Sequence, residues 1–363
     1  MCKLTLMKTT LVLAALTVSP VIAQPVYIGT AADGIYLADF DAETGVLTEP
    51  KLAAKYQTPG FLALHPEKPV LHCVGGGNTV ASFSIAEDHS LTLLGSASSG
   101  GKGPCHLAID ASGRTLAVAN YGDGSFATIR LNAEGKPGEI VSLLKMEGTG
   151  PNKQRQNEAH AHGVYFDNAN RFLFVPDLGI DKVLIYKFDP ATSELTPNDP
   201  AGMTSPAGAG PRHMAFSPDE KHAYIINELR NTVSVAKCDG KAGALIPIQE
   251  ILTLPAGFTD PSTTAEIEVH PNGNFVYGSN RGHDSIVVYQ RNPDSGTLEL
   301  IQHAPCGGKT PRHFKIHPSG KWLICAHQNS DTISVLSLDP ATGLLGEPKS
   351  TVTAPKPNCL LFP

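Results

Sequence analysis

The sequence has little of several features that define other classes of protein. Aromatic residues make up only 6% of the chain, with Trp322 as the single tryptophan, which argues against a broad aromatic surface for a protein partner. No Cys-x-x-Cys pair occurs, so the ligand spacing of a structural zinc site is absent. No long amphipathic helical pattern is present, and beyond the N-terminal region no apolar run approaches membrane-spanning length.

Positive charge is also scarce. The chain has 28 Lys and Arg against 34 Asp and Glu, a formal net charge of −6 at pH 7. Bulk charge of this sign disfavours nucleic acid and anionic membranes as partners. The sequence leaves the oligomeric state open, and the partner we expect is a small molecule.

The first residues have the pattern of a cleaved secretory signal. Lys8 precedes the apolar run LVLAALTV at 11–18, and small or modest residues lead to Ala23. We therefore expect residues 1–23 to be a signal peptide and the mature protein to be periplasmic or secreted. Removal of the signal peptide leaves 26 Lys and Arg against 34 Asp and Glu, a net charge of 26 − 34 = −8. It also leaves six cysteines, an even number that permits disulfides. Cys73 and Cys325, however, lie in strand-like runs, where a small buried apolar residue is the simpler interpretation.

What the sequence does have is an internal repeat of about fifty residues. Each repeat reads as strand, turn and strand, as in EIEVHPNGNFVYGSNR at 266–281 and HFKIHPSGKWLICAHQ at 313–328. A repeat of this length built from short β-runs is typical of a β-propeller. Six units begin near residues 61, 106, 162, 213, 266 and 313. The longest loops between repeats are predicted at 145–161, 199–211 and 254–265, all on one face. The two ends supply a seventh, since NCLLFP at 358–363 resembles a first strand and residues 26–50 supply its partners. We therefore predict an all-β, seven-bladed propeller over residues 24–363, closed by N- and C-terminal strands that share one blade.

Side chains that are mostly polar recur at two phases of the repeat. One phase follows a strand-like run and holds Gly75, Asn120, Asp177, Asn227, Asn280 and His327. In a propeller the innermost strand begins on the face where the second strand ends, so both phases are predicted to meet at one mouth of the central channel. Of nine arginines in the chain, Arg212, Arg281 and Arg312 fall on these phases, which indicates a site for an anionic or carbonyl oxygen ligand. The catalytic candidates are two guanidinium groups, a carboxylate and an imidazole with complementary roles: His162, Arg212, Glu228 and Arg281. The candidates for substrate binding are His160, Asp177, His213, Asn227, Glu266, Arg312 and Gln328.

Each candidate has a structural alternative. A histidine at the start of an inner strand often bonds the backbone of the next blade, and Asp177 has the position of a turn cap. The four catalytic candidates could also form an ion-pair cluster without chemistry. His160 competes with His162 for the imidazole role, and only the phase of the repeat favours His162.

Several motifs together resemble one known family. The strings are HAHGVYFD (160–167), VPDLGIDKV (175–183), GAGPRHMAFSPDEKHAYIINEL (208–229), AEIEVHPNGNFVYGSNR (265–281) and PRHFKIHPSGKW (311–322). They are similar to the seven-bladed propeller lactonases, typified by bacterial 6-phosphogluconolactonases and related to fungal carboxymuconate lactonizing enzymes. The resemblance covers essentially residues 25–363. It implies catalytic roles for His162, Arg212, Glu228 and Arg281, the same four residues that the repeat phase indicates.

The implied activity is that of a carboxylic ester hydrolase opening a sugar lactone in carbohydrate metabolism. Glu228 or His162 would take a proton from water, and the arginines would stabilise the oxyanion and bind a carboxylate or phosphate. No cofactor or metal is expected, because guanidinium charge acts where a metal otherwise would. Phosphorylated sugar lactones are cytoplasmic, whereas the export signal predicts a protein outside the cytoplasm. The identity of the lactone, and whether it is phosphorylated, therefore stays undetermined. Two alternatives remain, namely a lactonizing cycloisomerase that uses the same groups in reverse and a non-catalytic binding propeller.

Overall fold

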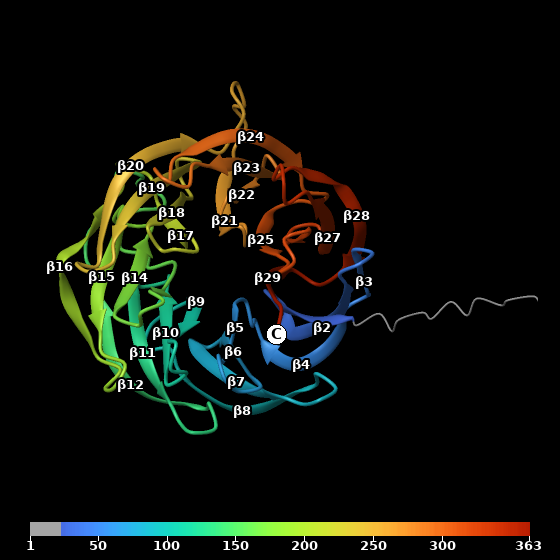
Figure 1. Ribbon diagram of the computed structural model, residues 1–363. Coiled ribbons are helices and arrows are strands. Elements are labelled where there is room, and N and C mark those ends of the chain that lie inside the picture. Colours follow the sequence, from blue (N-terminus) through green and yellow to red (C-terminus); the bar gives the residue numbers. More distant parts are fainter. Residues whose placement is uncertain (1–22) are drawn as a thin grey trace, which may run out of the picture.

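A computed structural model describes residues 23–363, which form a ring of seven β-sheets around a central channel (Figure 1). This confirms the predicted all-β propeller, and residues 23–363 contain no helix. No helix in this described part is therefore long and apolar enough to cross a membrane. The predicted signal peptide lies outside the described residues, apart from Ala23.

The shared blade closes the ring as predicted. Its strands are β29 (Pro357–Leu361), β1 (Gln24–Thr30), β2 (Asp33–Asp41), β3 (Val46–Leu47) and β4 (Lys51–Gln57). The C-terminal strand pairs antiparallel with the N-terminal strand, with Ile28 opposite Leu360. In Figure 1 the red end of the chain lies beside the blue strands β2 and β4. Joining the two ends in one sheet ties the first blade to the last and leaves no gap in the ring.

The other six blades have four antiparallel strands each, numbered outward from the channel. The second blade has β5 (Leu62–Leu64), β6 (Val70–Gly75), β7 (Thr79–Ile85) and β8 (Leu91–Ser98), and the third has β9 (Pro104–Ile109), β10 (Thr115–Asn120), β11 (Ser125–Leu131) and β12 (Pro137–Lys145). The fourth has β13 (Tyr165–Phe166), β14 (Phe172–Asp177), β15 (Lys182–Phe188) and β16 (Leu195–Thr204), and the fifth has β17 (Pro211–Phe216), β18 (His222–Asn227), β19 (Thr232–Asp239) and β20 (Ala244–Leu252). The sixth has β21 (Thr263–Val269), β22 (Phe275–Arg281), β23 (Ser285–Arg291) and β24 (Leu298–Pro305), and the seventh has β25 (Pro311–Ile316), β26 (Trp322–His327), β27 (Thr332–Leu338) and β28 (Leu345–Thr353).

Burial explains why the second strands read as apolar runs. Strands such as β10, β18 and β26 are buried along their whole length, because each packs between the sheets on both sides. The hydrophobic clusters cross from one blade to the next, and one of them joins Phe275 and Tyr277 of the sixth blade to Phe314 and Leu323 of the seventh. Full burial of one such side chain stabilises the fold by roughly 1.5–3 kcal/mol. The ring is therefore held by the contacts between neighbouring blades.

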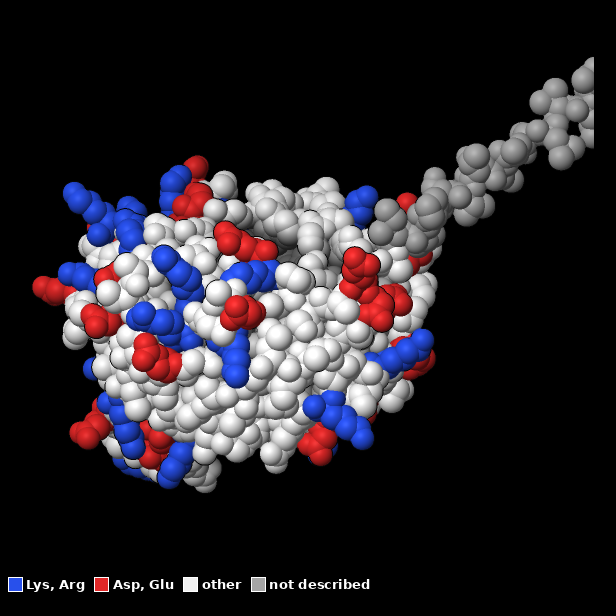
Figure 2. All heavy atoms as spheres, turned by 90° about the horizontal axis from the view of Figure 1, so that it is seen from below, with Lys and Arg blue, Asp and Glu red and all other residues white. Residues whose placement is uncertain are grey.

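One predicted loop is shorter than expected. Residues 199–211 read as a loop between repeats, but residues 199–204 extend β16, where Met203 pairs with Val183. The physical reason is that Met203 is buried against the next blade, so tertiary packing overrides a segment rich in Gly and Pro. On the outer surface shown in Figure 2, Lys and Arg lie beside Asp and Glu and form no patch of one sign.

Candidate active site

A repeated β-bulge places side chains at one mouth of the channel. In β9, β17, β25 and β29 the residue after a proline has no partner on the neighbouring strand, because the register shifts at that point. A bulge of this kind turns a side chain away from the regular alternation. The unpaired residues are Cys105, Arg212, Arg312 and Asn358. All four line one small cavity of about 180 Å³.

Three arginines surround the buried carboxylate of Glu228, which follows the end of β18. Glu228 Oε2 accepts from Arg212 Nε at 3.1 Å and lies 2.9 Å from Arg281 Nη2, while Oε1 accepts from Arg155 Nη2 at 2.6 Å. Burial opposes ionisation of Glu228, but Arg281 and Arg212 together hold its pKa well below its ordinary value. Glu228 is therefore a carboxylate at neutral pH and a weak base.

Backbone carbonyls fix two of these arginines. Arg212 Nη1 donates to Ala265 O at 2.7 Å, and Arg281 Nη2 donates to Thr264 O at 2.6 Å. Both carbonyls belong to β21, the inner strand of the sixth blade, which is the blade next to that of Arg212 and the blade of Arg281 itself. Two predicted catalytic residues from different blades are thus locked against one strand, with other N–H groups of each guanidinium left for a ligand.

Arg155 is a site residue that the sequence reasoning missed, because it lies in the long loop before β13 and outside the repeat. Its guanidinium also donates to Tyr121 Oη at 3.1 Å. The neighbouring Gln156 is buried and anchors the loop, since its Nε2 donates to Asp181 Oδ1 at 2.6 Å and to Leu178 O at 2.9 Å. The signal in the sequence was an arginine in an inter-blade loop that enters the predicted mouth.

Arg312 is the cation without a counter-charge. Among residues 23–363 its guanidinium group forms no salt bridge and no hydrogen bond, although Arg155, Arg212 and Arg281 all have partners. Burial, together with repulsion from Arg212 and Arg281, lowers the pKa of Arg312 to about 9. Four guanidinium groups and one carboxylate leave 4 − 1 = 3 positive charges around the opening. Such an excess of buried charge favours an anionic ligand.

His162 is the imidazole of this opening. It precedes β13, lies beside Tyr121 with ring centres 5.3 Å apart, and is almost fully buried. Burial and the charge of Arg212 hold its pKa well below the ordinary value, so the ring is neutral at pH 7. Cys105 Sγ lies 3.9 Å from His162 Nδ1, but burial raises the pKa of that thiol to about 12. The pair is therefore no thiolate nucleophile of the cysteine-protease kind.

His160 has a different position. Its ring stacks on Tyr121, with centres 4.4 Å apart and planes 12° from parallel, and its Nδ1 lies 2.7 Å from Tyr121 O. Its backbone N–H donates to Asp177 Oδ1 at 2.8 Å. His160 therefore supports the tyrosine, while His162 lines the cavity with Arg155, Glu228, Arg281 and Arg312. This cavity, which we call the cationic cavity, has a volume of about 380 Å³.

An aromatic layer borders the cavity of about 180 Å³, which Phe61, His213 and His313 line together with Arg212 and Arg312. Phe61 packs against His106, His213 and His313, with ring centres 4.1, 5.9 and 5.8 Å away. Burial lowers the pKa of His106 to about 3 and that of His313 to about 4, and it holds the pKa of His213 well below its ordinary value. The layer is therefore uncharged at neutral pH.

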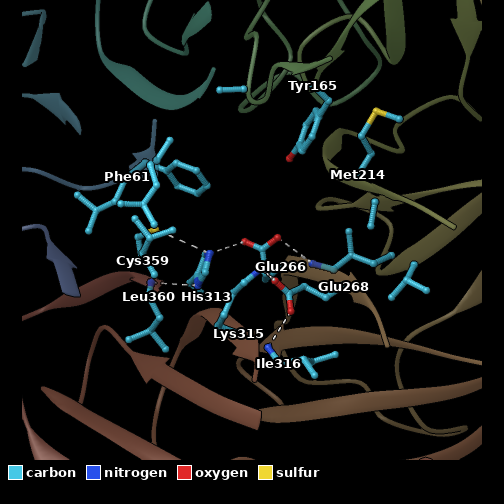
Figure 3. Close-up of a pocket in the computed structure, with 18 of the residues that line it drawn as sticks. Phe61, Tyr165, Met214, Glu266, Glu268, His313, Lys315, Ile316, Cys359 and Leu360 are labelled. Carbon is cyan, nitrogen blue, oxygen red and sulfur yellow. Dashed lines mark hydrogen bonds and ion pairs between the residues drawn. The ribbon is translucent and has the colours of Figure 1, made fainter. Parts of the chain in front are cut away.

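A larger cavity of about 680 Å³ follows below this layer (Figure 3). Glu266 borders it, with Oε2 lying 3.0 Å from His213 Nδ1 and 3.5 Å from His313 Nε2. Lys315 and Glu268 form an ion pair on the same wall. The remaining lining is mostly apolar, with Tyr165 and Met214 facing the space. Glu266 and His213, predicted to bind substrate, therefore lie below the guanidinium groups and pair with each other.

Three other candidates are not brought to the cationic cavity. Asp177 is buried, and its Oδ1 accepts from the backbone N–H groups of His160 and Gly179; burial raises its pKa to about 6. Asn227 is buried inside its blade and donates to the hydroxyls of Thr232 and Ser234. Gln328 begins a turn in which its N–H donates to Thr310 O. Asp177 therefore caps a turn, which is the structural role that its sequence position also allowed.

Comparisons with known proteins agree with this architecture. A family model described as "Lactonase, 7-bladed beta-propeller" matches residues 25–362. A 6-phosphogluconolactonase of Bacillus subtilis is 34% identical over 344 residues, covering 93% of this chain and 97% of the relative. A 6-phosphogluconolactonase of Formosa agariphila is 32% identical, covering 77% of this chain and 81% of the relative. A solved structure of a periplasmic gluconolactonase of Pseudomonas aeruginosa aligns with a TM-score of 0.88 at 30% identity, covering 94% of this chain and 99% of that one.

Proposed function

The chain belongs to the seven-bladed β-propeller lactonase family, a family of lactone hydrolases, and from this premise we propose that it hydrolyses a sugar lactone that carries an anionic group. The family predicted from the motifs is thereby confirmed. The observation that carries the proposed substrate is the excess of three positive charges around the opening, with Arg312 lacking any acidic partner among residues 23–363. Arg155, Arg281 and Arg312 line the cationic cavity, and Arg212 lines the cavity of about 180 Å³. A phosphate or carboxylate would neutralise that excess through bidentate contacts.

His162 supplies the base in this proposal. Lactone opening requires a group that takes a proton from water as the water attacks the ring carbonyl. Glu228 is poorly suited, because three guanidinium groups stabilise its charge and depress its basicity. His162 lines the same cavity and is neutral at pH 7, so an imidazole nitrogen is available to accept a proton, and fewer cations contact it than contact Glu228. Burial and the charge of Arg212 lower its pKa, and Glu228 offsets part of that effect. The attraction of Glu228 for the imidazolium then favours the proton transfer, because it raises the proton affinity of His162.

Arg212 and Arg281 stabilise the oxyanion. Their contacts with Glu228 and with β21 hold both groups rigidly, so little reorganisation is required when negative charge develops. The new C–O bond forms between water and the carbonyl carbon, and the ring C–O bond breaks. The proton taken by His162 passes to the departing ring oxygen, which gives a hydroxy acid. Arg312 and Arg155 bind the anionic substituent.

We also propose that the protein is exported, with a signal peptide at 1–23 and a propeller domain from Gln24 onward. The N-terminal pattern supports this, as does the periplasmic location named for the Pseudomonas aeruginosa relative. Expression of the full chain followed by cell fractionation and N-terminal sequencing tests it. A mature protein that retains Met1 in the cytoplasm would contradict export.

Acid release tests the activity. The mature chain should be assayed in a pH-stat against 6-phosphoglucono-δ-lactone, a carboxylated aldonolactone and neutral glucono-δ-lactone, with spontaneous opening subtracted. We expect kcat/KM for at least one anionic lactone to exceed that for the neutral lactone by roughly tenfold or more, because one charge-assisted contact contributes about 1.4 kcal/mol or more. Equal rates for all three would contradict an anionic substrate. Consumption of a muconate in place of lactone opening would favour the cycloisomerase.

A further inference from the structure

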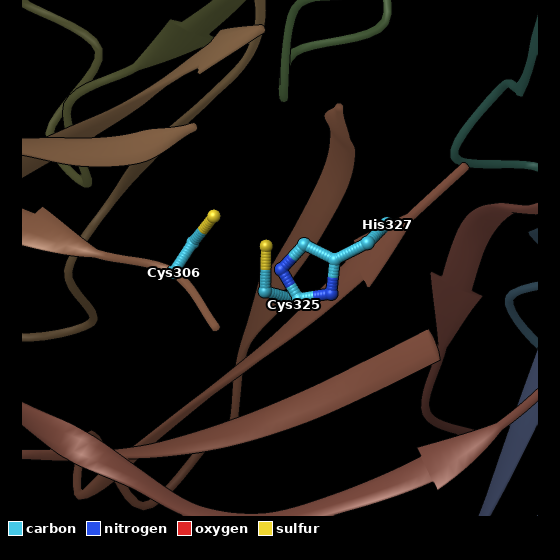
Figure 4. Close-up of side chains that lie close together, drawn as sticks. All are labelled: Cys306, Cys325 and His327. Atoms are coloured by element: carbon cyan, nitrogen blue, oxygen red, sulfur yellow. The ribbon is translucent and has the colours of Figure 1, made fainter. Parts of the chain in front are cut away.

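Three buried side chains outside the catalytic site converge between the sixth and seventh blades (Figure 4). Cys306 follows β24, while Cys325 and His327 lie on β26. One ligand atom from each of the three lies within 4.8 Å of the other two. None of them lines the cationic cavity. The sequence predicts no metal site because the ligand spacing is absent, but folding brings the three side chains together.

The internal repeat shows that this junction is different from its equivalents. At the end of β10, Asn120 Nδ2 donates to the carbonyl of Ser99 at 3.1 Å; at the end of β22, Asn280 Nδ2 donates to that of Thr253 at 2.9 Å. These bonds tie the third and sixth blades to the blades before them, whereas Asn227 of the fifth blade donates to hydroxyls of its own blade. In the seventh blade His327 takes the place of the asparagine, and Cys306 takes the place of Ser99 and Thr253.

The substituted junction has lost that hydrogen bond. The carbonyl of Cys306 accepts from Ser334 Oγ instead. Within residues 23–363 the two ring nitrogens of His327 are fully buried and have no partner. A buried polar group left unpaired destabilises a fold by about 1–3 kcal/mol. Cys306 Sγ contacts the carbonyls of Asp284 and Gly308 at 3.0 and 3.4 Å, so those contacts leave the imidazole unsatisfied.

We propose that Cys306, Cys325 and His327 bind a thiophilic d¹⁰ cation, zinc(II) or copper(I), that ties the sixth blade to the seventh. Thiolate sulfur and imidazole nitrogen are the donors that these ions prefer. Metal–sulfur bonds of about 2.3 Å keep two ligands within about 4.6 Å of each other, close to the 4.8 Å limit that the three atoms already satisfy. The ion would pair one of the two orphaned imidazole nitrogens.

The charge of the site favours zinc(II), and the number of its ligands favours copper(I). Two thiolates, a neutral imidazole and zinc(II) sum to zero charge, which suits a site with no exposed ligand. Residues 23–363 offer three ligands and no fourth, which suits copper(I), since structural zinc is almost always four-coordinate. Both ions make the same prediction for the fold, because a ligand that binds only the folded chain raises its melting temperature.

Metal loading of the purified mature chain tests the site. The chain is reduced, dialysed against a chelator, and titrated with zinc(II) or, under anaerobic conditions, with copper(I). Elemental analysis after gel filtration should find about one ion per chain, and Tm should rise by roughly 5 °C or more. Cobalt(II) gives an independent readout through thiolate-to-metal absorption. Lactonase activity at room temperature should not depend on the ion.

The chain itself offers the matched control. The double variant C306T/H327N recreates the Thr253–Asn280 junction, so it should fold and retain activity while losing metal retention and the Tm response. C238S changes a cysteine of β19, outside the proposed metal site, and should retain both the metal and the Tm response to it. Failure of the wild-type chain to hold stoichiometric metal, or equal retention by C306T/H327N, would overturn the proposal. So would intact-mass evidence that Cys306 and Cys325 form a disulfide in the protein as isolated.

Discussion

Replacement of Arg312 by glutamine should stabilise the empty protein and damage the enzyme, two effects of opposite sign. Arg312 lies at a bulge in β25 and lacks an acidic partner within residues 23–363, so its charge is repelled by Arg212 and Arg281 without compensation. Glutamine keeps part of the side-chain volume and removes the charge. The same charge is the one that we propose binds the anionic group of the lactone.

The size of the stability effect follows from the pKa. Burial and neighbouring charges lower the pKa of Arg312 from 12.5 to about 9, and each unit corresponds to about 1.4 kcal/mol. Because the folded-state pKa is the lower one, the charge destabilises the fold throughout the range below about pH 9. The undiscounted figure is about 5 kcal/mol. Water in the cavity reaches the partly accessible side chain and screens it, so we expect a gain of roughly 1–3 kcal/mol at pH 7.

Thermal melts and kinetic assays of the same sample test both effects, the gain in stability and the loss of activity. Arg312→Gln should raise Tm by roughly 1–4 °C and lower kcat/KM for the anionic lactone by about a hundredfold, because charge-assisted hydrogen bonds are lost. Arg230→Gln, which removes an exposed arginine paired with Glu250 on the outer face, should change neither quantity by much. A lower Tm together with unchanged turnover would refute the reasoning.

Four further predictions concern the same opening. Glu228→Gln leaves three guanidinium groups without their carboxylate, so the free energy of unfolding should fall by about 3–5 kcal/mol in denaturant titrations and kcat by roughly a hundredfold; an unchanged stability would contradict the ion-pair geometry. His162→Gln should lower kcat by roughly a hundredfold or more with KM little changed, and wild-type kcat would remove it as the base. Arg212→Lys should lower kcat/KM at least roughly tenfold, because lysine cannot hold Glu228 and the Ala265 carbonyl in one plane; near wild-type kcat/KM in a variant with unchanged Tm would remove Arg212 from the site. Tm should fall between pH 7 and pH 5, because the pKa values of the channel histidines are lowered and the unfolded chain binds protons that the folded chain does not. For each such group the free energy of unfolding falls by up to about 1.4 kcal/mol per pH unit. Asp177, whose pKa is raised to about 6, acts with the opposite sign, and a Tm that rises towards pH 5 would show that it dominates.

The fold was accessible from the sequence because its signal is repeated. The polar residues predicted to end second strands, such as Asn120, Asn227 and His327, are the last residues of β10, β18 and β26. The ends of the chain were identified as one blade because each matched a different part of the repeat. Residues 199–204 were misread, since the Gly and Pro of that segment suggested a loop, whereas the burial of Met203 between blades is a tertiary effect that no local pattern contains.

The repeat predicted which residues approach the mouth but could not tell which way each points. Asn227 and Asp177 are at the expected phase, yet their side chains turn into the blade and its turn. Arg212 and Arg312 are at the other phase and turn into the channel, because the bulge after a proline takes them out of register. Arg155 could not be found by phase at all, since its loop belongs to no repeat.

The same bulge explains how one strand supplies two chemical layers. In β9, β17 and β25 a proline is followed by the bulged residue and then by a histidine that resumes regular pairing. The bulged residues line the opening, and the histidines after them, at 106, 213 and 313, pack around Phe61 one layer below. The histidines of the lower layer are uncharged, and their buried rings give the guanidinium groups above them a wall of low polarity, which strengthens the attraction of those groups for an oxyanion. A change of charge in the histidine layer should therefore alter catalysis from below the cavity, without contact with the substrate.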